Sequence, residues 1–326
     1  MRDALKAGVL LVVAAVALTG CGSGGGGGGG AAPAGGGAGG SFIFLPKSLD
    51  NPYWVDARKG MEDAAAKLGV KAEFLGPPKD DAAAQVAIFE SALARQPLGI
   101  AVSPNDPGSV KDVISRARTA GIPVIAWDGP VPDSAVQGYI GTDNVAAGAR
   151  EGEALAEAIG NKGNVAVVIG SLSAPNLKQR LEGLTSALAK HPDIKVVATE
   201  ESGESVATAQ NKAETILQAN ADLAGMAGVG GSDLPGIAGA LKAGNRCGTV
   251  KAVGFDVVPQ GIEGMQGGCV QALVSQKPFG MTAAALKLLV DMRKGTSTQP
   301  NGFVIDTGVV VVKPGDLNTF LAQAPH

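Results

Sequence analysis

The feature that most constrains the fold is an alternation of short apolar runs with longer amphipathic stretches along residues 42–274. The apolar runs are uninterrupted Val, Ile and Ala, without the polar–apolar alternation of a strand that has one wet face. They are Phe42 to Leu45, Val70 to Leu75, Gly99 to Val102, Pro123 to Trp127, Val165 to Ile169, Ile194 to Thr199, Leu223 to Val229, Val250 to Phe255 and Val270 to Val274. We therefore predict parallel sheets that are buried on both faces, with right-handed β-α-β crossovers.

The amphipathic stretches between these runs predict the crossover helices. The clearest of them are Ala57 to Leu68, Ala82 to Arg95, Val110 to Ala120 and Ala147 to Ile159. The pattern indicates an α/β fold. The length beyond residue 40 fits either one large domain or two lobes of ordinary size.

Polar residues come just after several of the apolar runs: Lys47, Asn105, Asp128, Asp233 and Asp256. In an open parallel sheet these positions are the carboxyl ends of strands, where such folds bind their ligands. The alternative is that they cap the helices that follow.

Capping is the interpretation that we favour for Asn105 and Asp106, since Pro107 comes next. Asp128 lies between Trp127 and Gly129-Pro130, which is poor helix-start chemistry, and we favour a ligand role there. An aromatic ring offers a flat face to C–H groups, and a carboxylate accepts hydrogen bonds from adjacent hydroxyls. This pair suits a sugar.

The N-terminus indicates export. Arg2 and Lys6 precede an apolar run, Ala7 to Leu18, which is too short for a transmembrane helix and has the dimensions of a signal-peptide core. Leu18-Thr19-Gly20-Cys21 follows and resembles the bacterial lipobox, which implies a lipoprotein signal peptide over residues 1–20 and lipidation of Cys21. The alternative is an ordinary signal peptide with a chance cysteine.

Residues 21–40 are nearly all Gly and Ala, so we interpret them as a flexible tether. Disulfides survive in exported proteins, and Cys247 and Cys269 are the two cysteines that remain beyond Cys21. They form either one bridge or a pair of buried free thiols.

Composition argues against several other functions. The formal net charge is -3 and no block of Lys or Arg follows the leader, so we expect no nucleic-acid partner. Neither histidine, His191 or His326, has a second histidine or a cysteine at ligand spacing, so we expect no metal, no cofactor and no histidine-dependent catalysis. The segment Gly230 to Leu234 begins like a nucleophile elbow but lacks its closing glycine, and we interpret it as a strand-to-helix loop.

A set of short motifs, in order and at consistent spacing, resembles the periplasmic sugar-binding proteins of the ribose-binding type. The motifs are Asp50-Asn51-Pro52-Tyr53-Trp54, Pro123 to Asp128, Gly141-Thr142-Asp143-Asn144, Arg180-Leu181-Glu182-Gly183-Leu184, Gly254-Phe255-Asp256, and Gln276 before Lys277-Pro278. The likeness runs from about Phe42 to the C-terminus.

The resemblance implies two Rossmann-like lobes joined by three chain crossings, with the ligand clamped between the lobes. The crossings should lie near Thr142 to Asp143, near Gln276, and near Asp306 to Thr307. The N-terminal lobe would comprise residues 41–142 plus 277–306, and the C-terminal lobe residues 143–276 plus 307–326.

The resemblance also implies a ligand set. Tyr53 and Trp54 would sandwich a sugar ring, and Gln276 would lie at a hinge. The hydroxyls would be bound by Asn51, Asp128, Arg180 and Asp256, and Asp233 falls where the family usually has asparagine.

Three departures make ribose itself doubtful. Lys47 stands in place of a small hydroxyl residue, Gly129 in place of an arginine, and Glu204 in place of an aromatic ring. Lys47 resembles instead the branch that includes autoinducer-binding and rhamnose-binding proteins, in which the position of Asn176 also faces the ligand. The alternative for Lys47 is a solvated loop lysine.

These observations predict a monomeric, lipid-anchored solute-binding protein, periplasmic or on the outer face of the cell membrane. It would bind a sugar or polyol by hinge closure and deliver it to the permease of an ABC transporter. The main alternative is a sensory binder that acts on a membrane receptor. A sugar-responsive repressor would need an N-terminal DNA-binding domain where the leader stands. A sugar- or nucleotide-processing enzyme would need a P-loop or a dinucleotide fingerprint, which we do not find.

Overall fold

The computed structural model describes residues 40–132 and 136–323. Cys21, the signal peptide predicted over residues 1–20 and all but the last residue of the predicted tether lie outside the described residues. Within the described part, the strands form two sheets with six strands each.

The first sheet is parallel throughout, as predicted. In spatial order it contains β11 (Phe303–Asp306), β5 (Gly138–Gly141), β4 (Val124–Trp127), β3 (Gly99–Val102), β1 (Phe42–Leu45) and β2 (Ala72–Phe74). Four of these strands, β1, β3, β4 and β5, carry the uninterrupted apolar sequence that a strand covered on both faces requires.

The second sheet is parallel except at one edge. In spatial order it contains β12 (Val310–Val312), β10 (Val270–Ser275), β9 (Lys251–Phe255), β8 (Leu223–Gly228), β6 (Gly163–Ile169) and β7 (Ile194–Glu201). The expectation of purely parallel sheets is wrong for β12, which pairs antiparallel with β10. The end of β10, Ser275, lies beside the start of β12, Val310, so β12 enters the second sheet where β10 leaves it and runs in the opposite direction.

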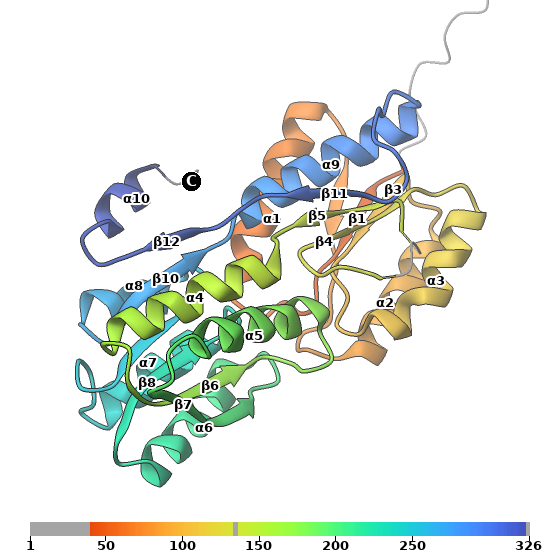
Figure 1. Cartoon of the computed structure of the whole chain (residues 1–326). Coiled ribbons are helices and arrows are strands. Elements are labelled where there is room, and N and C mark those ends of the chain that lie inside the picture. Colours follow the sequence, from red (N-terminus) through yellow and green to blue (C-terminus); the bar gives the residue numbers. More distant parts are fainter. Residues whose placement is uncertain (1–39, 133–135, 324–326) are drawn as a thin grey trace, which may run out of the picture. The chain divides into compact units, whose positions relative to one another are not determined.

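Helices cover both faces of each sheet (Figure 1). The first sheet with its helices is called the first lobe here, and these helices are α1 (Tyr53–Leu68), α2 (Ala82–Ala94), α3 (Pro107–Thr119) and α9 (Pro278–Lys294). The second sheet with its helices is called the second lobe, and these helices are α4 (Asn144–Ala158), α5 (Pro175–Leu188), α6 (Val206–Ala219), α7 (Asp233–Ala243), α8 (Pro259–Gln266) and α10 (Leu317–Gln323). The predicted α/β fold with two Rossmann-like lobes is confirmed.

Residue alternation along the strands divides each core in two. In β1, Phe42 and Phe44 pack with α1 and α9, whereas Ile43 and Leu45 pack with α2 and α3. Successive side chains of a strand point to opposite faces, so one strand contributes to both cores.

The chain passes between the lobes three times. The connections are β5 to α4, β10 to α9 and β11 to β12, and each is only two or three residues long. Residues 142–143, 276–277 and 307–309 therefore lie side by side at the junction of the lobes, where Thr307 donates two hydrogen bonds to the carbonyl oxygen of Gly141.

Two helix starts bear on the sequence interpretation. Asp106 caps α3 by accepting hydrogen bonds from the backbone N–H groups of Gly108 and Ser109, which confirms its predicted role. Asn105 does not cap, because both polar atoms of its buried side chain lack a partner among the described residues. Helix α1 begins at Tyr53 rather than at Ala57, so that both aromatic residues of the motif lie in its first turn.

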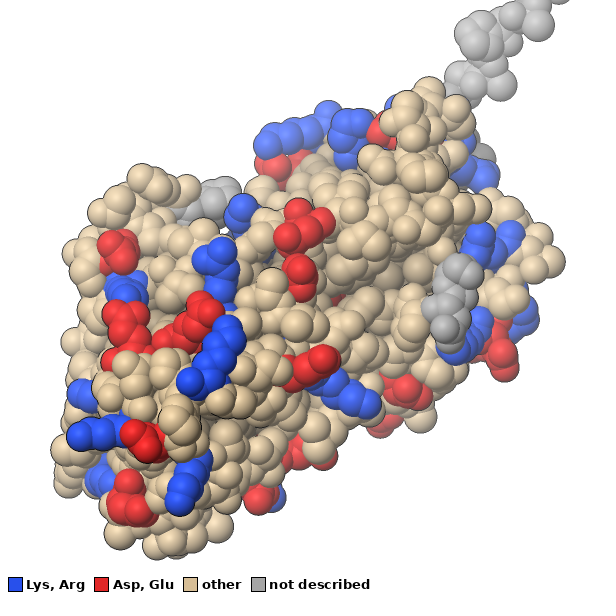
Figure 2. Space-filling view, viewed as in Figure 1, with Lys and Arg blue, Asp and Glu red and all other residues tan. Residues whose placement is uncertain are grey.

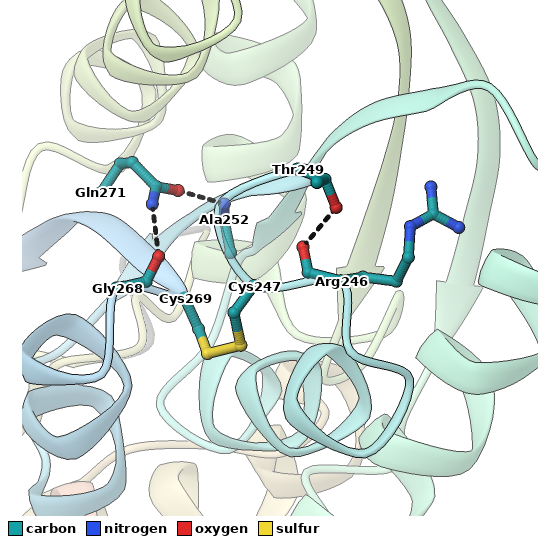
Figure 3. The surroundings of a disulfide bond; sticks show 7 residues. All are labelled: Arg246, Cys247, Thr249, Ala252, Gly268, Cys269 and Gln271. Carbon is teal, nitrogen blue, oxygen red and sulfur yellow. Dashed lines mark hydrogen bonds between the residues drawn. A yellow bond between two sulfur atoms is a disulfide. The ribbon is translucent and has the colours of Figure 1, made fainter.

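The structure joins Cys247 and Cys269 by a disulfide, with a sequence separation of 22 residues (Figure 3). Beside it, the side chain of Gln271 accepts a hydrogen bond from the N–H of Ala252 and donates one to the carbonyl oxygen of Gly268, at 2.7 and 3.1 Å. The bridge therefore reinforces the pairing of β9 with β10. Of the two alternatives from the sequence, the structure has the bridge.

The visible surface carries Lys and Arg interspersed with Asp and Glu, without a broad field of one sign on this face (Figure 2). Elsewhere along the helices, oppositely charged side chains form exposed pairs, such as Arg58 with Glu62 and Lys67 with Asp63. Exposed pairs of this kind contribute little to stability. None of the helices described within residues 40–323 has the length and apolar character needed to cross a membrane.

Candidate ligand-binding site

A cavity lies between the two lobes, at the carboxyl ends of the strands. Its lining residues are Lys47, Asn51, Tyr53, Trp54, Asp128, Asn176, Leu177, Arg180, Glu204, Gly230, Gly231, Asp256 and Gln276. Every residue of the ligand set that the resemblance implied lies here except Asp233. The Trp127 ring, which the sequence paired with Asp128 for a sugar, is fully buried and does not line the cavity, so that part of the prediction is wrong. Leu177, Gly230 and Gly231 were not predicted.

Lys47 and Asp128 form the polar part of the first-lobe wall. They follow β1 and β4, which are the two hydrogen-bonded neighbours of β3, so their side chains lie close together at one edge of the sheet. The Nζ atom of Lys47 lies 3.9 Å from Oδ2 of Asp128, and Oγ of Ser103 donates a 2.7 Å hydrogen bond to the same oxygen. Both charged side chains are almost fully buried, at 2% and 3% exposure. Lys47 is therefore not a solvated loop lysine.

Tyr53 and Trp54 supply the aromatic part of the first-lobe wall. Their ring centroids are 4.8 Å apart and their planes are inclined by 79°. Two rings in this arrangement are too close and too steeply inclined to hold a sugar between them, so the expected sandwich is wrong. Trp54 packs edge-on against Trp127 instead, with centroids 5.4 Å apart. Both rings thus belong to one wall of the cavity.

Arg180, on α5, is the main donor of the second-lobe wall. Its guanidinium donates to Oδ1 of Asn144 at 2.9 Å, to the carbonyl oxygen of Val229 at 3.2 Å and to Oε1 of Gln276 at 2.6 Å. It also lies over the Phe255 ring, 4.1 Å from the centroid. A guanidinium carries five N–H groups, so donors remain for a ligand.

Close helix packing places Arg180. A Cβ atom at Gly148 of α4 would lie 2.0 Å from the carbonyl oxygen of Arg180, and one at Gly183 of α5 would lie 2.0 Å from that of Val145. Glycine at both positions lets α4 and α5 approach until their backbones touch (Figure 1). This contact sets the depth at which Arg180 enters the cavity.

Gln276 connects the site to a chain crossing. Its Oε1 accepts hydrogen bonds from Oγ1 of Thr142, at 2.9 Å, and from Arg180, while its Nε2 donates to Oδ1 of Asp256 at 2.9 Å. Burial is the largest cause that raises the pKa of Asp256, to about 7, although the charge of Arg180 and the Gln276 hydrogen bond lower it. Asp256 therefore titrates near neutral pH.

Two hydrogen bonds cross the cavity from one lobe to the other. The Nζ atom of Lys47 donates to Oδ1 of Asn176, and Nδ2 of Asn51 donates to Oε2 of Glu204, both at 2.8 Å. The lobes are thus closed on each other by the same polar groups that line the cavity.

Asp233 does not line the cavity, which corrects the prediction. Its two carboxyl oxygens are used inside the second lobe: Oδ1 accepts from Oγ of Ser202 at 2.6 Å, and Oδ2 from the N–H of Gly230 at 2.7 Å. Burial, followed by repulsion from Glu204, raises its pKa well above the ordinary value. Asp233 holds the Gly230 loop in place and does not face a ligand.

Tyr139 and Asn144 form a second layer behind the cavity that the sequence analysis missed. The Tyr139 hydroxyl lies 2.8 Å from the carbonyl oxygen of Asp128 and 3.2 Å from that of Thr142, and it accepts a hydrogen bond from Nδ2 of Asn144 at 3.4 Å. Asn144 in turn accepts from Arg180. A polar network therefore runs from Asp128 through the first crossing to Arg180. The motif Thr142-Asp143-Asn144 was its only sequence signal.

The arrangement is that of a binding site. Carboxyl and amide oxygens accept hydrogen bonds from hydroxyls, Lys47 and Arg180 donate, and the two rings offer apolar faces. In the described part of the chain, no group of three His, Cys, Asp or Glu side chains is arranged to hold a metal ion.

Comparison with known proteins agrees with this geometry. The family model described as "Periplasmic binding protein domain" matches residues 42–297. The D-allose-binding periplasmic protein of Escherichia coli (strain K12) is 30% identical over 263 residues, which cover 78% of this chain and 85% of that protein.

Solved structures resemble the whole described fold. A solute-binding protein of an ABC transporter from Burkholderia graminis, solved with D-arabinose, has a TM-score of 0.82 and 36% identity, and the match covers 86% of this chain and 97% of that one. GanP, a glucose-galactose binding protein from Geobacillus stearothermophilus, has a TM-score of 0.80 and 32% identity, with 86% and 99% covered.

The chain belongs to the periplasmic binding protein domain family. It is a solute-binding protein and not an enzyme, and the resemblance found in its sequence is confirmed.

Proposed function

We propose that this protein binds a monosaccharide or a related polyol between its lobes and delivers it to the permease of an ABC importer. The observation that carries the proposal is the composition of the cavity, in which buried carboxyl groups and two strong donors surround an aromatic wall. The sugars named for the similar proteins, D-allose, D-arabinose, glucose and galactose, are ligands of this chemical kind.

Binding would proceed by closure about the three crossings. We assign residues 41–142 plus 277–306 to one moving lobe and residues 143–276 plus 307–326 to the other. In the open form Asp128 and Lys47 would separate from Asn176 and Arg180, and the sugar would enter between them. On closure its hydroxyls replace the direct bonds between lobes, in a site from which water is excluded.

Closure can be communicated to a partner through the hinge. Gln276 lies at the second crossing and bonds both Thr142 at the first crossing and the ligand-binding groups Arg180 and Asp256. A sugar that contacts these groups therefore changes the hydrogen bonding of two crossings at once. The permease would recognise the closed arrangement of the lobes.

A thermal-shift screen against monosaccharides and polyols tests the proposal. A ligand at a hundred times its dissociation constant stabilises the native state by about 2.7 kcal/mol, which a melting curve resolves. We expect a stabilising sugar or polyol in the screen. A complete absence of carbohydrate hits, with hits among amino acids or peptides, would contradict the sugar assignment.

We also propose that the chain is exported and anchored by a lipid on Cys21, with residues 21–40 as the tether. The support is the leader itself, a short apolar core followed by Leu18 to Cys21. Expression with an alkyne-labelled fatty acid should label the wild-type chain and leave Cys21→Ser unlabelled and released from the membrane. Equal membrane retention of both would contradict the anchor.

Delivery to a permease is tested in cells. Deletion of the gene should abolish uptake of the radiolabelled sugar found in the screen, and complementation should restore it. Unchanged uptake combined with a lost transcriptional response to that sugar would assign the protein to sensing instead.

A further inference from the structure

The two walls of the cavity differ in chemistry. The first lobe contributes the rings of Tyr53 and Trp54. Among the cavity residues that the second lobe contributes none is aromatic, and Leu177 is the only one with an apolar side chain. Phe255 of that lobe is fully buried beneath the guanidinium of Arg180 and does not line the cavity. Aromatic surface is therefore available on one side of a bound ring only.

Glu204 supplies a carboxyl group to the opposite wall. It lies on the loop between β7 and α6, has a φ of 57° and is 6% exposed. Its backbone is held by Oγ of Ser232, which donates a 2.8 Å hydrogen bond to the Glu204 carbonyl oxygen. The side chain reaches across the cavity to Asn51. Within the described residues, Oε2 of Glu204 accepts this one hydrogen bond. A carboxylate can accept several, so acceptor capacity remains for a ligand.

The first-lobe wall also holds a donor without a partner. The indole Nε1 of Trp54 is buried and has no hydrogen-bond partner among the described residues. A ligand oxygen that reaches the edge of the indole would accept a hydrogen bond from this N–H group, while the C–H groups of the ligand lie on the rings. A hydroxyl group of a sugar ring can supply the acceptor for the indole N–H, and one face of the sugar ring can supply the C–H groups.

We propose that Glu204 selects monosaccharides that carry an axial hydroxyl, an inference that rests on the proposed sugar-binding function. A pyranose with only equatorial hydroxyls presents C–H groups on both faces, and therefore suits a cavity with two apolar walls. An axial hydroxyl places a hydrogen-bond donor on one face. That face matches the Glu204 wall, and the remaining C–H face matches Tyr53 and Trp54.

An all-equatorial ring in this cavity would cover the Glu204 carboxyl with C–H groups. A bound sugar takes the place of the Asn51 hydrogen bond and of water at the Glu204 carboxyl. With C–H groups against it the carboxyl would gain no new hydrogen-bond donor, which is unfavourable for a buried acceptor. We expect the resulting discrimination between epimers to be about tenfold or more, the range seen when a buried polar group is left unpaired.

The experiment measures dissociation constants by calorimetry for sugars that differ at one centre. The probes are D-glucose with its epimers D-allose, D-galactose and D-mannose, and D-xylose with its epimer D-ribose. Each probe is used as its 1-deoxy pyranose, because the α-anomer of a free sugar carries an axial hydroxyl at C1. The 1-deoxy forms of glucose and xylose then carry only equatorial hydroxyls in their favoured chairs, and each epimer adds one axial hydroxyl. The wild-type protein should bind at least one epimer about tenfold more tightly than its all-equatorial counterpart.

Two variants separate selection from a general structural effect. Glu204→Met removes the acceptors at similar length and should reduce the epimer ratio to near one. Glu204→Gln keeps one acceptor oxygen and should retain an intermediate ratio. A substitution that only loosens the loop would weaken both sugars equally and leave the ratio unchanged.

The proposal is overturned if glucose, xylose or an acyclic polyol binds tightest, or if the epimer ratio is unchanged in Glu204→Met. Either result leaves sugar or polyol binding itself intact. Failure of every carbohydrate to bind would instead overturn the proposed function, so the two failures are distinguishable.

Discussion

The Nζ atom of Lys47 in the first lobe donates a 2.8 Å hydrogen bond to Oδ1 of Asn176 in the second. The same ammonium group is the cation 3.9 Å from Asp128, so one side chain serves both a contact between lobes and a buried carboxyl. Removal of a partner from such a pair leaves the other polar groups buried and unpaired.

Lys47→Met should therefore weaken sugar binding about 10- to 100-fold, because a hydrogen bond to a charged group contributes about 1.5–3 kcal/mol. Calorimetric titration measures the effect. Lys59→Met is the matched control, since Lys59 is 56% exposed on α1. Equal affinities for the two variants would remove Lys47 from the ligand set.

Gly231→Ala should hinder closure. A Cβ atom there would lie 3.1 Å from Oδ1 of Asn51 and from Cβ of Tyr53, both in the opposite lobe, and 2.8 Å from Oδ2 of Asp256. The contacts with Asn51 and Tyr53 are absent from the open form, whereas the Asp256 carboxyl group, in the same lobe as Gly231, must shift in both forms. We therefore expect a small decrease in the melting temperature without ligand and a smaller sugar-induced decrease in the radius of gyration. Gly315→Ala, with nothing within 4 Å, is the control. A normal decrease in the Gly231→Ala protein would show that the lobes do not approach here.

Glu151→Gln should raise stability at alkaline pH. Glu151 is fully buried on α4, and neither carboxyl oxygen has a hydrogen-bond partner among the described residues. Burial raises its pKa well above the ordinary 4.5, so between these values the folded chain keeps a proton that the unfolded chain releases. Stability of the wild-type protein then falls as pH rises through this window.

Thermal unfolding at pH 5 and pH 8 measures the difference. Gln does not titrate, so the advantage of Glu151→Gln over wild type should be larger at pH 8 than at pH 5, because one unit of pKa difference between the folded and unfolded chain is worth about 1.4 kcal/mol. An advantage that is the same at both pH values would mean that Glu151 is ionised in the folded protein or that its pKa is ordinary.

Sugar affinity should fall on acidification from pH 8 to pH 6. The pKa of Asp256 is raised to about 7, mainly by burial, so most of this carboxyl is ionised at pH 8 and protonated at pH 6. The ionised form is the stronger acceptor for a sugar hydroxyl. We expect the dissociation constant to rise by up to about tenfold over this range, and Asp256→Asn to abolish the pH dependence.

Asp80 provides the control for this titration. Its pKa is raised to about 6, by burial first and then by the charge of Glu204, yet it does not line the cavity. Asp80→Asn should keep the pH dependence of binding. If Asp80→Asn lost the pH dependence and Asp256→Asn kept it, then titration of Asp80, outside the cavity lining, would be its cause.

The fold could be predicted from the sequence because a buried strand is recognisable from a short apolar segment, as in Val165 to Ile169. The carboxyl ends of parallel strands lie at the same edge of a sheet, so residues that follow those strands are expected close together. The sequence therefore predicts Lys47, Asp128 and Asp256 around one cavity, where the structure has them. Their contact with a ligand stays a prediction, as do the lobe boundaries, the lipid on Cys21 and the monomeric state.

Other features depend on contacts that no local pattern reports. Asp233 follows a strand just as Asp128 does, but its oxygens meet Ser202 and Gly230 inside the lobe. The inclination of Tyr53 to Trp54 is set by the packing of Trp54 against Trp127. The antiparallel direction of β12 follows from its start at Val310 beside the end of β10 at Ser275, a contact between segments far apart in the sequence.

The crystal structure of the protein with the sugar or polyol found in the screen tests the central claim most directly. We expect one carbohydrate molecule between the lobes, hydrogen-bonded to Asp128 of the first lobe and to Arg180 and Asp256 of the second. A carbohydrate bound outside this cavity, or held by one lobe only with the other lobe swung away, would contradict it.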